Sequence, residues 1–277
     1  MSDIAIEREN GPSLEADPRE AARVLRAAAR AGRHDGLTTG LAPGMVQANL
    51  VVLPAEWADD FRRFCALNAQ ACPLLAETAP GETALPGLAE DIDLRLDLPR
   101  YNVFRDGRLV AEATDLRALW QDDFVAFALG CSYSFEEALV SAGLRLRHLD
   151  QGVKVPTYLT NVETVPAGPF RGPTIVSMRP FSPADAIRAI AITARFEKVH
   201  GPPIHFGDPG AIGIEDLDRP YSGAPPVLYP GEVPLFWACG VTPQVVLARA
   251  RPPIAITHKA GHMLITDLLN ADLATPS

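Results

Sequence analysis

The sequence predicts an α/β protein whose three-layer main domain is interrupted by a smaller α+β domain. Amphipathic segments of helical period alternate with short apolar segments of strand length in the first half of the chain. The composition then changes between residues 150 and 232, which are rich in proline and in short β-like runs. Apolar strand-like segments return after that stretch. We therefore assign residues 15–150 plus 232–277 to the main domain and residues 151–231 to the inserted one.

The individual helices and strands are predicted from residues typical of helix ends and turns and from the spacing of apolar residues. A helix over 17–32 can begin with Asp17 or Ser13 as its cap and has Pro18 in its first turn, and it ends at Gly32. Ser182 and Pro183 start a second clear helix, over 182–201, in the same way. The other predicted elements are a loop and strand over 40–54, an amphipathic helix over 55–68, a hairpin over 101–113 that turns at Asp106-Gly107, and strands over 123–129 and 233–239, followed by "PIAITH" and "MLITDLL".

Composition and charge exclude several classes of partner. The chain has 277 residues, of which 47% are hydrophobic, and a formal net charge of −9. Nucleic acids and anionic membranes attract basic surfaces, so neither is an expected partner. The first ten residues do not read as a leader, and no apolar run is long enough to span a membrane, so we expect a cytoplasmic protein. A homodimer stays an open alternative.

The four cysteines, at positions 65, 72, 131 and 239, do not have the close spacing of metal ligands. We expect free thiols, with Cys65 packed as a small apolar residue of the helix over 55–68. His258 and His262 have i, i+4 spacing, but Gly261 between them argues against the helix that a zinc site would need. We therefore expect neither a metal nor another cofactor.

Two of the cysteines occupy the same position in two similar segments. "FALGCSYSFEEALVSAGLRLRH" (127–148) aligns without gaps with "LFWACGVTPQVVLARARPPIAI" (235–256), which places Cys131 over Cys239. Each segment reads as an apolar strand, a cysteine, a hydroxyl residue and a helix. Both cysteines are thus predicted in strand-to-helix turns at the carboxyl ends of parallel strands, where open α/β sheets bind ligands. A chance likeness between two ordinary βα units is the alternative.

The helix starts in these two segments predict an anion-binding region. Ser134 with Glu137 has the spacing of a capping box, and Thr242 followed by Pro243 predicts a helix cap. Backbone N–H groups at helix starts favour an anion. An exposed thiol there would have a lowered pKa, whereas a buried one would be inert.

Three other stretches offer polar groups near loops or strand ends. "VHGPPIHFGDPGAIGI" (199–214) contains His200, His205 and Asp208, which belong to a site or, as the alternative, form a turn in which Asp208 bonds its own backbone. Arg179 ends a predicted strand and could hold a carboxylate or form a surface ion pair. Gln47 and Asn49 could bind a polar ligand or pin a turn.

No Walker A, G-x-G-x-x-G, G-x-S-x-G or H-E-x-x-H sequence occurs, which argues against the nucleotide-binding and hydrolase classes that these motifs mark.

Six stretches in order resemble the D-glutamate cyclase family, whose bacterial members are commonly labelled hydro-lyases. They are "GLAPGMVQANLVVLP", "DFRRFCALNAQACPLL", "GCSYSFEEAL", "PAGPFRGPTIVSMRP", "HGPPIHFGDPGAIGI" and "WACGVTPQ…ITHKAGHMLITD". The resemblance implies conversion of D-glutamate to 5-oxo-D-proline and water, with a small amino or carboxylic acid as the ligand.

That reaction requires a base at the amine, an acid at the leaving oxygen and donors for an oxyanion. The candidate catalytic residues are Cys131, Glu136, Cys239, His205, Asp208, His258 and His262. The candidate substrate-binding residues are Asn49, Ser132, Ser134, Arg179, Thr242 and Gln244. Two alternatives remain open: a cofactor-independent two-cysteine amino-acid racemase or epimerase, and a small-acid-binding protein without turnover.

Overall fold

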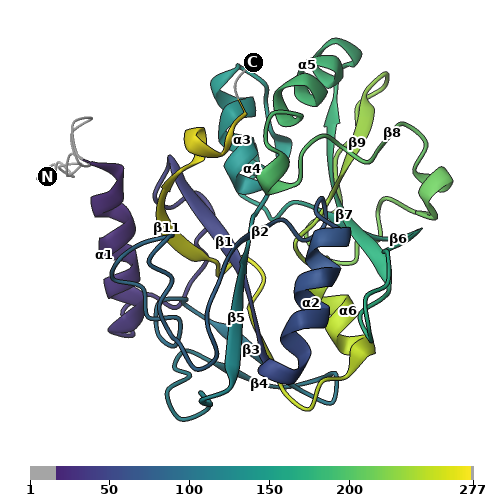
Figure 1. Ribbon diagram of the computed structural model, residues 1–277. Helices are drawn as coiled ribbons and strands as arrows, with labels where there is room; N and C mark the ends of the chain where they lie inside the picture. The colour runs from purple at the N-terminus through teal and green to yellow at the C-terminus, as the bar shows by residue number, and fades with distance from the viewer. Residues whose placement is uncertain (1–16, 276–277) are drawn as a thin grey trace, which may run out of the picture.

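The computed structural model describes residues 17–275, which form a mixed α/β fold built on two antiparallel sheets (Figure 1). The larger sheet has the strand order β2-β5-β1-β10-β3-β4, with β11 also paired to β1. Its strands are β1 (Met45–Pro54), β2 (Leu74–Glu77), β3 (Tyr101–Arg105), β4 (Arg108–Ala113), β5 (Phe124–Leu129), β10 (Ala255–His258) and β11 (Leu264–Leu269). The smaller sheet has the order β6-β7-β9-β8, from β6 (Thr157–Glu163), β7 (Pro173–Phe181), β8 (His205–Phe206) and β9 (Val233–Ala238).

The helices confirm the α/β class that the sequence predicts. They are α1 (Pro18–Arg30), α2 (Ala55–Leu67), α3 (Tyr133–Ser141), α4 (Arg147–Asp150), α5 (Pro183–Thr193) and α6 (Thr242–Ala250), with short 3₁₀ turns η1 (Glu197–Val199), η2 (Pro209–Ile212) and η3 (Asn270–Leu273). Among residues 17–275, none of these helices is long and apolar enough to cross a membrane. The proposed division at residues 151–231 stays a prediction.

The expectation of parallel strands is wrong. Every strand pair in the described part of the chain is antiparallel, and β5 and β9, which precede the two cysteines, lie in different sheets. Fully buried strands such as β5 are typical of parallel sheets, but here the burial has another cause. Alternate residues of β1 and β5 pack on one face against the coil around residues 85–98 and on the other against α2 and α6.

The local signals at α1 and at the β3–β4 hairpin work as the sequence predicts. The Asp17 carboxylate accepts a hydrogen bond from the Arg19 N–H at 3.0 Å, which caps α1. The alternative cap, Ser13, lies outside the described residues. Asp106 and Gly107 both have positive φ, +48° and +77°, as a two-residue hairpin turn requires. Local chemistry alone therefore determines these two features.

The predicted caps of α3 and α6 are wrong. Ser132 and Val241 are the N-cap residues, and neither side chain makes a capping hydrogen bond. Instead, the Cys131 and Cys239 sulfurs accept backbone N–H groups at the two helix starts. Thr242 turns its hydroxyl away from its own helix, where it accepts a hydrogen bond from the Ile175 N–H of β7 at 3.0 Å.

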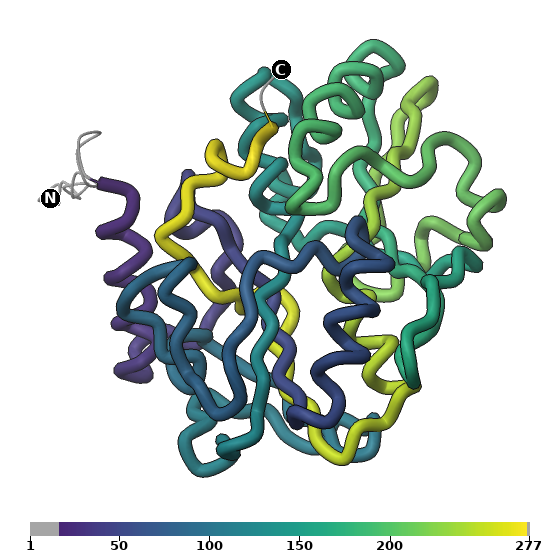
Figure 2. Tube along the Cα trace, in the orientation of Figure 1, coloured from purple at the N-terminus to yellow at the C-terminus, as the bar shows by residue number. Residues whose placement is uncertain are grey.

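The end of the chain packs beside β1 and α3 (Figure 2). β11 pairs with the first half of β1 and β10 with its second half, so β1 has two successive partners along one edge. β10 ends at His258, next to the point where one partner replaces the other. This change of partner places His258 beside the turns that carry the two cysteines.

Candidate active site

Cys131 and Cys239 line one small pocket of about 40 Å³, although they follow strands of different sheets. The pocket is lined by Asn49, Cys131, Ser132, Tyr133, Lys154, Val155, Thr157, His200, Cys239, Gly240, Val241, His258, Ala260, Gly261 and Met263. The structure therefore brings together the two cysteines, Asn49, Ser132 and His258 from the predicted set.

The two cysteines have the same local geometry. The Cys131 sulfur accepts a hydrogen bond from the Tyr133 N–H, and the Cys239 sulfur accepts one from the Val241 N–H. Burial nevertheless outweighs these hydrogen bonds. It raises the pKa of Cys131 to about 12 and also raises the pKa of Cys239. Lys154 and Arg179 partly offset the effect at Cys239. Both groups are therefore thiols at neutral pH, in contrast to the lowered pKa expected of exposed helix-start cysteines.

A buried ion pair supports the start of α3. Glu136 and Arg179 are 3% and 1% exposed, and the Arg179 Nε donates to the Glu136 carboxylate at 2.9 Å. A second guanidinium nitrogen donates to the Ser132 hydroxyl at 3.1 Å. Burial alone would raise the pKa of Glu136, but Arg179 and His148, whose ring nitrogen lies 3.1 Å from the carboxylate, hold it below its ordinary value.

Arg179 is thus engaged by protein groups, and it does not line the cysteine pocket. Its guanidinium also lies 5.2 Å from the centre of the Phe135 ring and 5.3 Å from that of Trp237. Sequence reasoning treated Glu136 and Arg179 as separate candidates for proton transfer and carboxylate binding. The structure makes them partners, which suits positioning of Ser132 and α3 better than contact with a substrate.

Backbone hydrogen bonds hold His258 at the point where β11 replaces β10 as the partner of β1. Its Nδ1 accepts a hydrogen bond from the Leu50 N–H at 3.2 Å, and Gln244 donates to the His258 carbonyl oxygen at 3.3 Å. Burial lowers the pKa of His258 to about 4, so the ring is neutral at pH 7. With Nδ1 accepting, the proton is on Nε2, which makes His258 a hydrogen-bond donor in the pocket. Gln244 then acts as a support for His258.

Of two further lining residues, sequence reasoning missed Lys154 and named His200 only as part of the loop over 199–214. Lys154 is the pocket's amine, and its Nζ donates to the Ser222 hydroxyl at 3.1 Å. Burial lowers the pKa of Lys154. His200 is 1% exposed and has φ of +91°, which is unusual for a residue other than glycine. The sequence holds no motif around Lys154, whereas the "VHG" turn at His200 was visible as a rigid loop.

Besides Glu136, Arg179, Gln244 and His262, four more candidate residues lie outside the pocket lining. His205, on β8, donates its Nε2–H to the Asp208 carbonyl oxygen at 2.7 Å, and the Asp208 carboxylate accepts from the Gly210 N–H, as in a simple turn. Ser134 lies inside α3, and Thr242 binds β7. We leave these four out of the site. His262 is buried near His258 and contacts the Ala260 carbonyl oxygen at 3.2 Å.

Within residues 17–275, no three His, Cys, Asp or Glu side chains gather closely enough to hold a metal ion. The pocket offers two thiols, one ammonium, two neutral imidazoles and backbone N–H groups. Such a set can bind a carboxylate and transfer protons.

Comparison with known proteins identifies the family to which this chain belongs. The family model described as D-glutamate cyclase matches residues 125–267, which include both cysteines, Lys154 and His258. A protein of Bordetella petrii named "Putative hydro-lyase Bpet2233" is 60% identical over 249 residues, covering 90% of this chain and 94% of the relative. A "Putative hydro-lyase" of Verminephrobacter eiseniae is 58% identical over 258 residues, covering 93% of both chains. The chain belongs to the D-glutamate cyclase family.

In this D-glutamate cyclase family member, the buried Cys131 thiol should react slowly with alkylating agents. A pKa near 12 in place of 9 leaves Cys131 with about a thousandfold less thiolate at neutral pH. We expect iodoacetamide at pH 8 to modify Cys131 far more slowly than in the denatured chain, with a rate that rises with pH. Peptide mass spectrometry over time would measure this for each cysteine. Rapid modification of Cys131 at pH 7 would contradict the assignment.

The same D-glutamate cyclase family member should lose stability as the pH falls. Burial lowers the pKa of His200 and of His258 from 6.5 to about 4, so below pH 6.5 the unfolded chain binds protons that the folded chain does not. The stability from these rings is therefore complete above pH 6.5 and is lost toward pH 4. Each should contribute a slope of about 1.4 kcal/mol per pH unit. Urea unfolding between pH 5 and 7 would measure the slope, and a constant free energy of unfolding would contradict it.

Proposed function

We propose that this protein is a lyase that cyclises D-glutamate to 5-oxo-D-proline with loss of water, in the pocket of Cys131 and Cys239. The observation that carries the proposal is that two thiols 108 residues apart in the chain line one pocket with Lys154 and His258. The family and the names of its relatives support the lyase class.

Substrate orientation is assigned to Lys154. A carboxylate entering the pocket finds Lys154 as its cation, because Arg179 is already paired with Glu136. An α-carboxylate bound there would add negative charge beside a partly buried ammonium and so raise the lowered pKa of Lys154. The Asn49 side chain, which donates to the Gly130 carbonyl oxygen at 2.7 Å, lines the pocket as a second polar contact.

The two sulfurs are assigned to proton transfer. The ring closes when the amine nitrogen bonds to the side-chain carboxyl carbon and a C–O bond breaks. Two protons leave the nitrogen, and two reach the departing oxygen, which leaves as water. Cys239 is a thiol in the empty pocket, and it is the proposed base once it has lost its proton to solvent. Arg179, Lys154 and the incoming ammonium favour that loss, because each lowers the pKa of Cys239. Cys131, with a pKa near 12, stays protonated and is the proposed acid.

The oxyanion formed on attack needs donors in place before the reaction. His258 supplies its Nε2–H, since its Nδ1 accepts the Leu50 N–H. A neutral donor suits this role, because a pKa near 4 prevents the ring from titrating at neutral pH. His258 is thus proposed as an electrophile and not as the proton carrier that the sequence suggested.

The direct test is to incubate the purified protein with D-glutamate and with L-glutamate and to follow cyclisation by NMR. We expect 5-oxoproline from D-glutamate alone, and none with the Cys131→Ala variant. Since ring closure is reversible, 5-oxo-D-proline should also be tested as a substrate. A lack of turnover in both directions over a wide concentration range would refute the assignment.

The matched geometry of the two sulfurs favours one second function, a two-cysteine racemase or epimerase. Two thiols that each accept an N–H from the residue two positions later could remove and return an α-proton from opposite sides. Solvent deuterium would then enter Cα of the amino acid. The NMR experiment run in D₂O separates the two functions, because cyclisation leaves the Cα proton in place.

A further inference from the structure

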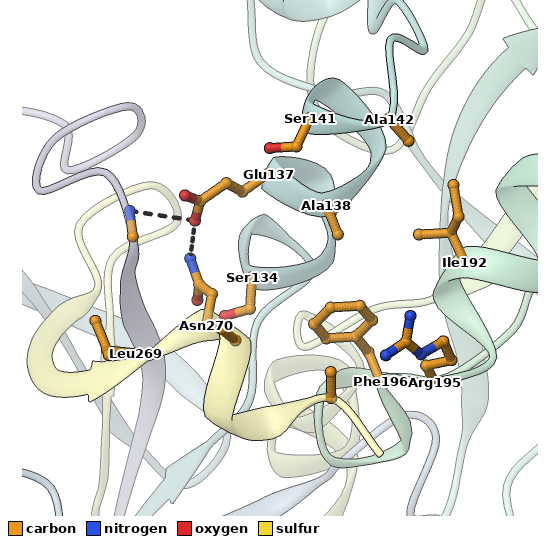
Figure 3. Close-up of a pocket in the computed structure, with 13 residues that line it drawn as sticks. Ser134, Glu137, Ala138, Ser141, Ala142, Ile192, Arg195, Phe196, Leu269 and Asn270 are labelled. Atoms are coloured by element: carbon orange, nitrogen blue, oxygen red, sulfur yellow. Dashed lines mark hydrogen bonds between the residues drawn. The ribbon is translucent and has the colours of Figure 1, made fainter. Parts of the chain in front are cut away.

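A second, larger cavity lies outside the cysteine pocket, between α3, α5 and η3 (Figure 3). Its volume is about 580 Å³, which is the size of a small-molecule site. Figure 3 shows Ser134, Glu137 and Asn270 on one side of the cavity, and Ile192, Arg195 and Phe196 on the other. The proposed reaction uses none of these residues.

One side of the cavity carries oxygen atoms that lack hydrogen-bond donors. Ser134 is 1% exposed and Asn270 is 8% exposed, yet the Ser134 hydroxyl and the Asn270 Oδ1 have no hydrogen-bond partner within residues 17–275. The Asn270 Nδ2 donates to the Glu137 carboxylate at 2.5 Å, which identifies Oδ1 as the free acceptor. A buried polar group without a partner costs about 1–3 kcal/mol. A ligand with N–H donors would remove that cost.

A neighbouring cavity strengthens the preference for a positive ligand. It has a volume of about 200 Å³ and shares Gly44, Glu137, Ser141 and Asn270 with the larger one. There the buried Gln47 Oε1 likewise has no donor in the described part of the chain. Glu137 therefore lies among three side chains with unpaired oxygens, and no Lys, Arg or His of residues 17–275 forms an ion pair with it. This side of the cavity favours an ammonium group.

The opposite side favours an anion and an apolar body. The Arg195 Nε donates to the Thr275 carbonyl oxygen at 3.2 Å, and no carboxylate of residues 17–275 forms an ion pair with the guanidinium. Between Arg195 and Glu137 the lining is largely apolar, from Ala138, Ile192, Phe196 and Leu269. A ligand whose carboxylate binds Arg195 and whose ammonium binds Glu137 would therefore match the charge at each end of the cavity.

We propose that this cavity is a second binding site, for zwitterions with an apolar body, the class of apolar amino acids and short apolar peptides. The ammonium lies among Glu137, the Asn270 Oδ1 and the Ser134 hydroxyl, and the carboxylate binds Arg195. The site is independent of the two cysteines, since no residue lines both this cavity and the cysteine pocket.

Calorimetric titration with leucine, leucyl-leucine and leucyl-leucine amide tests the proposal. We expect saturable binding of at least one zwitterion. Arg195→Gln should weaken the binding of that zwitterion at least about tenfold and leave the amide, which lacks the carboxylate, within about twofold. Ser134→Ala should weaken both ligands without lowering the Tm, because the hydroxyl has no partner to lose.

Cys239→Ser separates this site from the proposed active site. It should leave leucine and leucyl-leucine binding within about twofold, whether or not the protein cyclises D-glutamate. Three results would each overturn the proposal: no saturable binding of either zwitterion up to about 20 mM, binding that both Arg195→Gln and Ser134→Ala leave unchanged, or binding that disappears with Cys239→Ser.

Discussion

Replacement of Cys239 by alanine should lower kcat for D-glutamate cyclisation by at least about a hundredfold and change KM little. The sulfur is assigned to proton transfer, which contributes about 10²–10⁴ to rates, whereas Lys154 is assigned to substrate binding. Lys154→Met should do the opposite and chiefly raise KM. Initial rates by NMR over a range of D-glutamate concentrations would measure both constants.

Cys72 provides the matched control for this substitution. It is a fully buried thiol whose neighbour is Cys65, and it does not line the cysteine pocket. Cys72→Ala should therefore retain the activity of the folded protein even if it lowers the Tm. Equal losses of kcat in Cys72→Ala and Cys239→Ala would show that the effect of Cys239 is structural.

Replacement of Arg179 by methionine should destabilise the protein by about 3–5 kcal/mol, because Glu136 would be left as a buried charge without its guanidinium. Methionine keeps an apolar side chain of similar length but loses the guanidinium, which in Arg179 lies over the Phe135 and Trp237 rings. For a chain of this size the Tm should fall by more than about 6 °C. Differential scanning calorimetry would measure it.

A double substitution distinguishes the charge from the packing. Glu136→Gln in the Arg179→Met background removes the unpaired carboxylate and should recover part of the lost stability. Arg117→Met, which breaks an exposed pair with Asp115, should leave the Tm unchanged. If the double variant is no more stable than Arg179→Met alone, the charge account is wrong.

Features that depend on neighbouring residues could be predicted from the sequence. The Asp17 cap and the Asp106-Gly107 turn need only two or three adjacent residues, and both form as expected. Ser182 likewise caps α5 through the Asp185 N–H at 3.2 Å, although α5 ends at Thr193, earlier than the helical pattern suggested. In each case the side chain satisfies a backbone group of its own turn.

Features that depend on distant pairing could be predicted only in part. The likeness around Cys131 and Cys239 correctly grouped the two cysteines, because each turn repeats one local geometry. Apolar content did not distinguish parallel from antiparallel strands, since coil and helices bury both faces of the large sheet. The partners of Arg179 and the position of Lys154 depend on how the two sheets pack, which no local pattern encodes.

The Leu50–His258 hydrogen bond ties the acid–base state of one ring to the integrity of a strand. Where β1 exchanges β10 for β11, the imidazole Nδ1 replaces a main-chain carbonyl as acceptor for the Leu50 amide. If that nitrogen were protonated, its N–H would face the Leu50 N–H, and the hydrogen bond between the two residues would be lost. Acid should therefore loosen the larger sheet at this point, while both thiols, whose pKa values are raised, stay protonated.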